Sequence, residues 1–268
     1  MNRIAALFSR LGEARRKALV PFITAGDPSR ESTVAVMHAL VAGGADLIEL
    51  GVPFSDPMAD GPVIQRSSER ALERGVGTTQ VFDFVREFRL LDPNTPVVLM
   101  GYLNPIEMRG ADRYAAEASQ AGVDGLLLVD LPAEEAAPIR ASLNAHGLDL
   151  ISLVAPTTSQ ERLRRVADSS QGYLYYVSFA GVTGATITDV SDVAAKAGAL
   201  RAMATVPVLI GFGIKDTRSA AAMAPLADGI VVGSALVERL ASATSVRDAA
   251  RRATDFLAPL RAAIDAAT

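Results

Sequence analysis

The sequence of 268 residues contains no cysteine and only two histidines. The absence of cysteine excludes disulfides, cysteine–metal sites and thiol nucleophiles, and it leaves the redox compartment open. His38 and His146 both fall in segments with helical periodicity, away from the ends of the expected strands. A metal site needs several converging ligands, so surface or packing roles suit these histidines better, and we expect no metal site.

Lysine and net positive charge are also scarce. The three lysines, at positions 17, 196 and 215, all lie outside the expected strands, whereas a Schiff-base aldolase would place its lysine within one. A lyase with this composition would have to use carboxylates as acid and base. The net charge of −4 argues against nucleic acid or an anionic membrane surface as the main partner.

No apolar run approaches transmembrane length, and no secretory signal is evident. The first twenty residues carry five basic side chains, with apolar residues at positions 4, 7, 8 and 11 in helical spacing. A mitochondrial presequence would share these features. Glu13 and the immediate transition into a strand instead favour an amphipathic helix packed on the fold, and we expect a cytoplasmic protein.

Eight short apolar runs alternate with longer amphipathic segments. The expected strands are residues 19–24, 46–50, 96–100, 124–129, 149–154, 173–178, 207–211 and 229–232, and helical periodicity marks residues 32–41, 80–91 and 133–145. This pattern predicts an α/β protein, one (β/α)8 TIM barrel over residues 1–268 with an extra N-terminal helix. A doubly wound open sheet is the alternative, but no Gly-x-Gly-x-x-Gly follows the first strand.

Two carboxylates flank the loop after the second strand. By strand alternation Glu49 lies opposite Ile48 and Leu50, facing the barrel interior. A buried ion pair with an arginine is one interpretation, but we favour a working acid, because an unpaired acid is costly there. Asp60 ends the same loop, where Asp-Gly-Pro is also a common turn and helix-start sequence. Together they could form an acid/base pair.

The last three strand ends are rich in glycine, at residues 181–184, 211–213 and 233–234. Glycine lets backbone N–H groups approach an anion, and barrels often bind phosphate after strands seven and eight. Simple turns are the alternative, but three neighbouring loops favour a phosphate site. Tyr175, in the aromatic run 173–176, faces either the core or a polar site, and its spacing does not decide between them.

Several sequence blocks resemble the tryptophan synthase alpha chain family. They are residues 21–28 (PFITAGDP), 49–62 (ELGVPFSDPMADGP), 100–105 (MGYLNP), 181–184 (GVTG), 211–214 (GFGI) and 233–234 (GS). The blocks run in order across nearly the whole chain, and the 49–62 block is highly specific. The resemblance implies a barrel lyase that cleaves indole-3-glycerol phosphate into indole and glyceraldehyde 3-phosphate. It also implies no cofactor in this chain and a partner beta chain, carrying pyridoxal phosphate, in an α2β2 assembly.

The resemblance also implies roles for particular residues. The catalytic residues would be Glu49, Asp60 and Tyr175, and the substrate and phosphate positions would be Phe22, Met100, Thr183, Gly184, Gly213, Gly233 and Ser234. Protonation of indole C3 would suit Glu49 if burial raises its pKa toward neutrality. An ionised Asp60 could stabilise the charge on the ring N–H, and Glu49 could then accept the proton of the glycerol hydroxyl.

Two other functions remain open at this point, a free-standing lyase and a non-catalytic sugar-phosphate-binding barrel. The loop of residues 53–60 bears on this choice because it ends at Asp60. We expect Val52, Pro53, Phe54 and Met58 to be exposed and to form an apolar surface for the beta chain, although inward packing is the alternative for Phe54 and Met58. A partner at Asp56 or Pro57 would then shift Asp60 and raise turnover.

Overall fold

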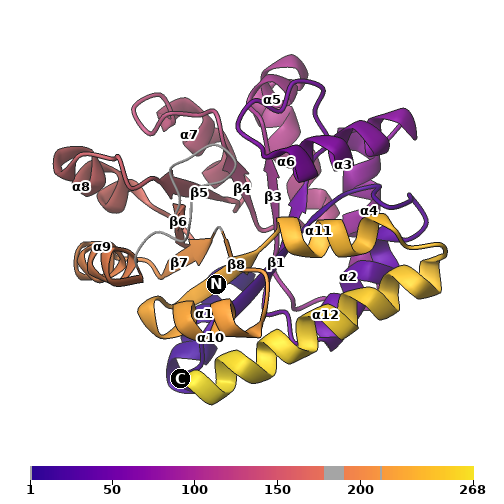
Figure 1. The fold of residues 1–268 in the computed structure, drawn as a ribbon. Coiled ribbons are helices and arrows are strands. Elements are labelled where there is room, and N and C mark those ends of the chain that lie inside the picture. The colour runs from indigo at the N-terminus through magenta and orange to yellow at the C-terminus, as the bar shows by residue number, and fades with distance from the viewer. Residues whose placement is uncertain (1, 178–189, 212) are drawn as a thin grey trace.

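Eight parallel strands form a closed barrel in a computed structural model that describes residues 2–177, 190–211 and 213–268 (Figure 1). The strands are β1 (Ala18–Thr24), β2 (Ile48–Gly51), β3 (Val97–Gly101), β4 (Gly125–Leu128), β5 (Asp149–Val154), β6 (Leu174–Val177), β7 (Val208–Gly211) and β8 (Gly229–Val232). They pair in chain order, and β8 closes the barrel against β1. The (β/α)8 prediction is confirmed, and the open-sheet alternative is wrong.

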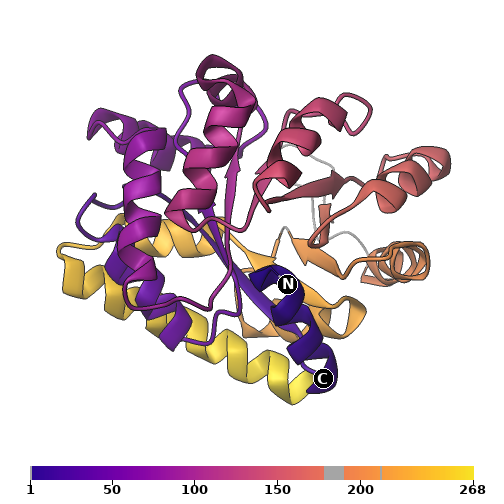
Figure 2. The same cartoon turned by 180° about the vertical axis from the view of Figure 1, so that it is seen from behind.

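Helices surround this barrel (Figure 2). They are α1 (Arg3–Glu13), α2 (Thr33–Ala42), α3 (Pro62–Glu73), α4 (Thr78–Arg89), α5 (Asn104–Arg109), α6 (Ala111–Ala121), α7 (Ala137–Ala145), α8 (Gln160–Ser169), α9 (Val190–Met203), α10 (Thr217–Met223), α11 (Ser234–Ala241) and α12 (Val246–Ala267), with a 3-10 turn η1 (Ala224–Leu226). Helix α7 begins four residues later than predicted, because Pro138 fixes its first turn. Helix α12 continues through Pro259.

The N-terminal helix closes one end of the barrel, as the amphipathic pattern predicts. Ile4, Leu7 and Leu11 of α1 are buried in one cluster with inward-facing strand residues. Each such side chain contributes roughly 1.5–3 kcal/mol when it is fully buried. Hydrogen bonds from Asn2 and Arg3 to acids at the starts of β5 and β4 attach the helix to the amino ends of the strands. The carboxyl ends at the opposite rim remain for a functional site.

Strand alternation separates two cores. Ile48 and Leu50 of β2 pack outward with the surrounding helices, whereas Val98 and Tyr173 belong to the inner cluster. Glu49 is paired in register with Phe22 on β1 and with Val98 on β3, and it points inward as predicted. No helix of the described chain is both long and apolar enough to cross a membrane.

Candidate active site

Glu49 is fully buried, with 0% of its surface exposed. The hydroxyl of Tyr173 donates a hydrogen bond of 2.6 Å to its Oε1, and Oε2 has no hydrogen-bond partner among the described residues. Burial raises the pKa of Glu49 from 4.5 to about 7, and the Tyr173 hydrogen bond only partly opposes this shift. The arginine ion pair considered above is therefore wrong, and the carboxyl can both hold and release a proton near neutral pH.

Sequence reasoning missed Tyr173 as the partner of this acid. Tyr173 and Tyr175 lie on the inward face of the barrel, and the Phe8 ring of α1 lies 6.2 Å from the Tyr173 ring. Tyr175 is half-buried, and the nearby Glu49 carboxyl adds to burial in raising its pKa. A Cβ atom at Gly211 would collide with the Tyr175 hydroxyl, so glycine on β7 leaves the room that this ring needs. The structure thus brings Tyr175 to the Glu49 side of the barrel.

Asp60 does not cap helix α3, which was its simplest structural interpretation. Gly61 occupies the N-cap position without a side-chain hydrogen bond, and the Asp60 Oδ2 atom instead accepts a 3.0 Å hydrogen bond from Tyr102. Gln65 donates from Nε2 to the Asp60 carbonyl at 2.9 Å and to the Pro57 carbonyl at 3.3 Å, which fixes the end of the loop. Burial raises the pKa of the Asp60 carboxyl, and the Tyr102 hydrogen bond opposes the rise.

A small pocket lies at the carboxyl ends of the first strands. Phe22, Met100 and Asp60 line it, together with Thr24, Gly51, Val52, Ile64, Ser68, Gly101, Tyr102 and Val129. Glu49 is not one of the lining residues, but Phe22, its register partner on β1, is. The cavity walls are largely apolar with one carboxyl at the side, which suits a flat aromatic ring that carries a hydrogen-bond donor.

The loop of residues 53–60 is less apolar on its surface than we expected. Val52 and Pro53 are buried, and Phe54 is half-buried, with its ring stacked on Tyr102 at 4.8 Å between centroids. The prediction that these three residues are exposed is wrong. For Phe54 the alternative of inward packing is confirmed, because the Tyr102 ring offers a stacking surface that the sequence does not reveal. Met58 is 86% exposed, as predicted, and the alternative of inward packing is wrong for it.

Two of the expected phosphate loops lie near each other in the described structure. Gly213 follows β7, and Gly233 is the N-cap of α11, which begins at Ser234 directly after β8. Gly213 has a φ of +77°, which glycine adopts at little cost, and a Cβ atom there would meet open space. Thr183 and Gly184 lie outside the described residues. Among the described residues, no group of three His, Asp or Glu side chains could hold a metal ion.

The structure is a closed (β/α)8 barrel with a buried acid that can hold a proton and a second acid toward its carboxyl-terminal rim. This arrangement is typical of barrel enzymes that work by acid–base catalysis. Comparison with known proteins narrows this class. The family model described as "Tryptophan synthase alpha chain" matches residues 8–265. The chain therefore belongs to the tryptophan synthase alpha chain family.

Individual relatives agree over the full length. The alpha chain from Xanthomonas oryzae pv. oryzae is 63% identical over 268 residues, covering 100% of both chains. The alpha chain from Xanthomonas campestris pv. campestris is 62% identical over 266 residues, covering 99% of this chain and 98% of the relative. The crystal structure of tryptophan synthase subunit alpha from Legionella pneumophila superposes with a TM-score of 0.93 at 46% identity, covering 99% of each chain. A structure of Mycobacterium tuberculosis tryptophan synthase superposes with a TM-score of 0.88 at 35% identity, covering 98% of each chain.

The expectations that the resemblance raised about activity are confirmed at this level of identity. The chain is a carbon–carbon lyase of tryptophan biosynthesis that cleaves indole-3-glycerol phosphate into indole and glyceraldehyde 3-phosphate. Alpha chains of this family carry no cofactor, since pyridoxal phosphate belongs to the beta chain. The non-catalytic binding barrel is thereby excluded.

Proposed function

We propose that Glu49 and Asp60 carry the retro-aldol cleavage within one barrel unit formed by residues 1–268. The observation that carries this proposal is the pKa of Glu49, which burial raises to about 7. A carboxyl of that pKa protonates indole C3 as a general acid and afterwards takes the proton of the glycerol hydroxyl beside the breaking bond. Asp60 accepts a hydrogen bond from the N–H group of the indole ring and stabilises the positive charge that forms there.

The remaining site residues hold the substrate. Phe22 and Met100 form apolar walls for the indole, and Tyr175 shapes the inner side next to Glu49. Thr183 and Gly184 belong to this proposal by resemblance alone. Gly213, Gly233 and Ser234 supply backbone N–H groups to the phosphate, helped by the positive end of helix α11. Fixing the phosphate holds the scissile bond within reach of both carboxyls.

Replacement of Gly213 by valine tests the phosphate site. A side chain there strains the left-handed backbone and occupies the space that an anion needs, so we expect KM for indole-3-glycerol phosphate to rise about tenfold or more, with a smaller change in kcat. Steady-state kinetics and binding of glycerol phosphate measure this effect. Gly147→Val is the matched control, because Gly147 has a φ of +73° and open space but lies between α7 and the start of β5, at the amino end of the strands. Unchanged glycerol phosphate binding in Gly213→Val would place the phosphate elsewhere.

We also propose that the chain works as the alpha subunit of an α2β2 assembly with a tryptophan synthase beta chain. The family supports this, because structures of tryptophan synthase from Mycobacterium tuberculosis are among the similar structures. Within the chain, Ser55, Asp56 and Met58 are exposed on the loop that ends at Asp60. A partner that presses on this loop would move a proposed catalytic carboxyl and change turnover. A free-standing lyase is the second candidate.

Asp56→Ala separates these two candidates. The Asp56 carboxylate is exposed and bound only by its neighbour Ser55 at 2.6 Å among the described residues, so its loss should leave cleavage by the isolated chain within about twofold. We expect excess beta chain to raise indole release by the parent chain and to raise it severalfold less in the variant. Equal activation of both proteins would show that Asp56 plays no part in activation by the beta chain. A parent chain that the beta chain does not activate would favour the free-standing lyase.

A further inference from the structure

Tyr102 holds both ends of the loop that carries Asp60. It directly follows β3, and its ring stacks on Phe54 at the start of the loop with an interplanar angle of 25°. At the other end, its hydroxyl accepts a 3.1 Å hydrogen bond from the backbone N–H of Ala59 and donates a 3.0 Å bond to Asp60 Oδ2. One side chain from the neighbouring strand thus fixes the position and the orientation of the carboxyl.

We propose that Tyr102 is a positioning residue that holds Asp60 ionised and directs its second oxygen toward the substrate. A phenol has a single proton, and since the Ala59 N–H already donates to the phenol oxygen, that proton is directed to Asp60. A carboxylate accepts such a bond, whereas a protonated carboxyl would compete as a donor. Oδ1 of Asp60 makes no hydrogen bond to the described residues, which leaves it for a ring N–H. This inference rests on the proposed role of Asp60.

The surroundings of Tyr102 keep it in this role. The Asp130 carboxylate at the end of β4 accepts a 2.8 Å hydrogen bond from the N–H of Leu103, which anchors the backbone next to Tyr102. Burial, followed by the negative charges of Asp60 and Asp130, raises the pKa of the Tyr102 hydroxyl, so it remains a donor at all working pH values. Of the charged groups on α3, Arg66 and Glu69 are exposed, and Arg70 is paired with Asp27 at 2.7 Å.

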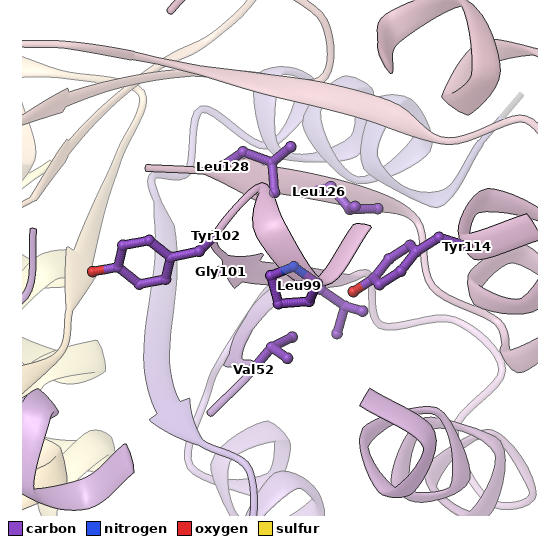
Figure 3. A pocket seen from close by; sticks show the side chains of 8 residues that line it. Val52, Leu99, Gly101, Tyr102, Tyr114, Leu126 and Leu128 are labelled. Atoms are coloured by element: carbon purple, nitrogen blue, oxygen red, sulfur yellow. The ribbon is translucent and has the colours of Figure 1, made fainter. Parts of the chain in front are cut away.

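A second tyrosine provides a matched control. Tyr102 and Tyr114 lie on opposite sides of an outer cavity between β3, β4 and the following helices, whose other walls include Leu99 and Leu126 (Figure 3). The Tyr102 hydroxyl points away from this cavity, and the Tyr114 hydroxyl points toward its centre (Figure 3). Both rings are buried, but among the described residues only the Tyr102 hydroxyl contacts the 53–60 loop. Removing either hydroxyl therefore changes the packing to a similar extent, but only removal of the Tyr102 hydroxyl takes a hydrogen bond away from Asp60.

The experiment compares Tyr102→Phe and Tyr114→Phe with the parent chain in the pH dependence of indole-3-glycerol phosphate cleavage. Without the Tyr102 hydroxyl the ionised form of Asp60 is less favoured, so the acid limb of the kcat/KM profile should move to higher pH. We expect kcat to fall about tenfold and KM to change less than twofold, as for loss of one hydrogen bond to a charged group. Tyr114→Phe should follow the parent in both respects.

A double-mutant cycle with Asp60→Asn separates this inference from the role of Asp60 itself. If Tyr102 acts through the Asp60 carboxylate, adding Tyr102→Phe to Asp60→Asn should change kcat less than twofold. A parental pH profile in Tyr102→Phe, or the same loss on both backgrounds, would overturn the positioning role while leaving Asp60 in place. Full activity of Asp60→Asn would instead overturn the proposed function.

Discussion

Glu49→Gln should lower kcat for indole-3-glycerol phosphate cleavage by about 10³-fold while KM changes less than about threefold, because general acid–base catalysis contributes roughly 10²–10⁴-fold. Glutamine has the shape of the protonated acid and can still accept the 2.6 Å hydrogen bond from Tyr173. It cannot donate a proton to indole C3 or accept one from the glycerol hydroxyl. Initial rates of indole release, measured over a range of substrate concentrations, give kcat and KM. Turnover close to that of the parent would refute the assignment of Glu49 as acid and base.

The pH dependence provides a second, independent measurement on the same variant. The parent needs Glu49 protonated at the start of the reaction, so kcat/KM should fall as pH rises through about 7, the pKa of that carboxyl in the fold. Its ordinary value is 4.5, so folding favours the protonated form. The stability linked to Glu49 is therefore fully present below pH 4.5 and is lost as pH rises through about 7.

Glu49→Gln removes this titration, which gives the variant a stability signature. At pH 8 to 9 it should be more stable to urea than the parent by up to about 3 kcal/mol, since one unit of pKa corresponds to about 1.4 kcal/mol. The gap should close near pH 4. An inactive variant that shows this signature is folded, so its lost activity is chemical. A gap that does not vary with pH would mean that Glu49 titrates normally in the fold.

The sequence reveals the fold because a parallel strand that is buried on both faces consists of a nearly continuous run of apolar residues. Glu49 stands out for the same reason, as the one carboxylate in the run 47–50. Its partner could not be found in this way, because Tyr173 lies 124 residues away in the chain and only barrel closure brings the two together. The spacing left open whether Tyr175 faces the core or a polar site, and no local pattern tells which side chains the aromatic run 173–176 would meet.

Loop residues were harder to interpret than strand residues. Asp-Gly-Pro is equally compatible with a helix cap and with a catalytic acid, and only the Tyr102 contact distinguishes them for Asp60. The exposure of Phe54 was predicted wrongly for a related reason, since its stacking partner comes from the next strand. Hydrogen bonds and ring contacts between loops depend on three-dimensional register, and no local periodicity encodes them.

Asp60→Asn should lower kcat by about 10²-fold or more, because a charge aimed at a developing cation in a water-poor site is worth several kcal/mol, like a single oxyanion-hole donor. Asparagine keeps the size of the side chain and an oxygen that can accept the Tyr102 hydrogen bond. The change therefore removes the negative charge and little else. The acid limb of the kcat/KM profile, which we attribute to protonation of Asp60, should disappear, while the fall through about pH 7 that reports Glu49 should remain.

Asp56→Asn is the matched control for this variant, because it removes a carboxylate from the same loop at an exposed position four residues earlier. In the isolated chain it should retain the parent's kcat and both limbs of the pH profile. Two outcomes would count against the role of Asp60. If Asp56→Asn lost as much activity, the total charge of the loop would matter more than one carboxyl. If Asp60→Asn kept an acid limb, another group would be titrating there, and the charge on the indole ring would have to be stabilised elsewhere.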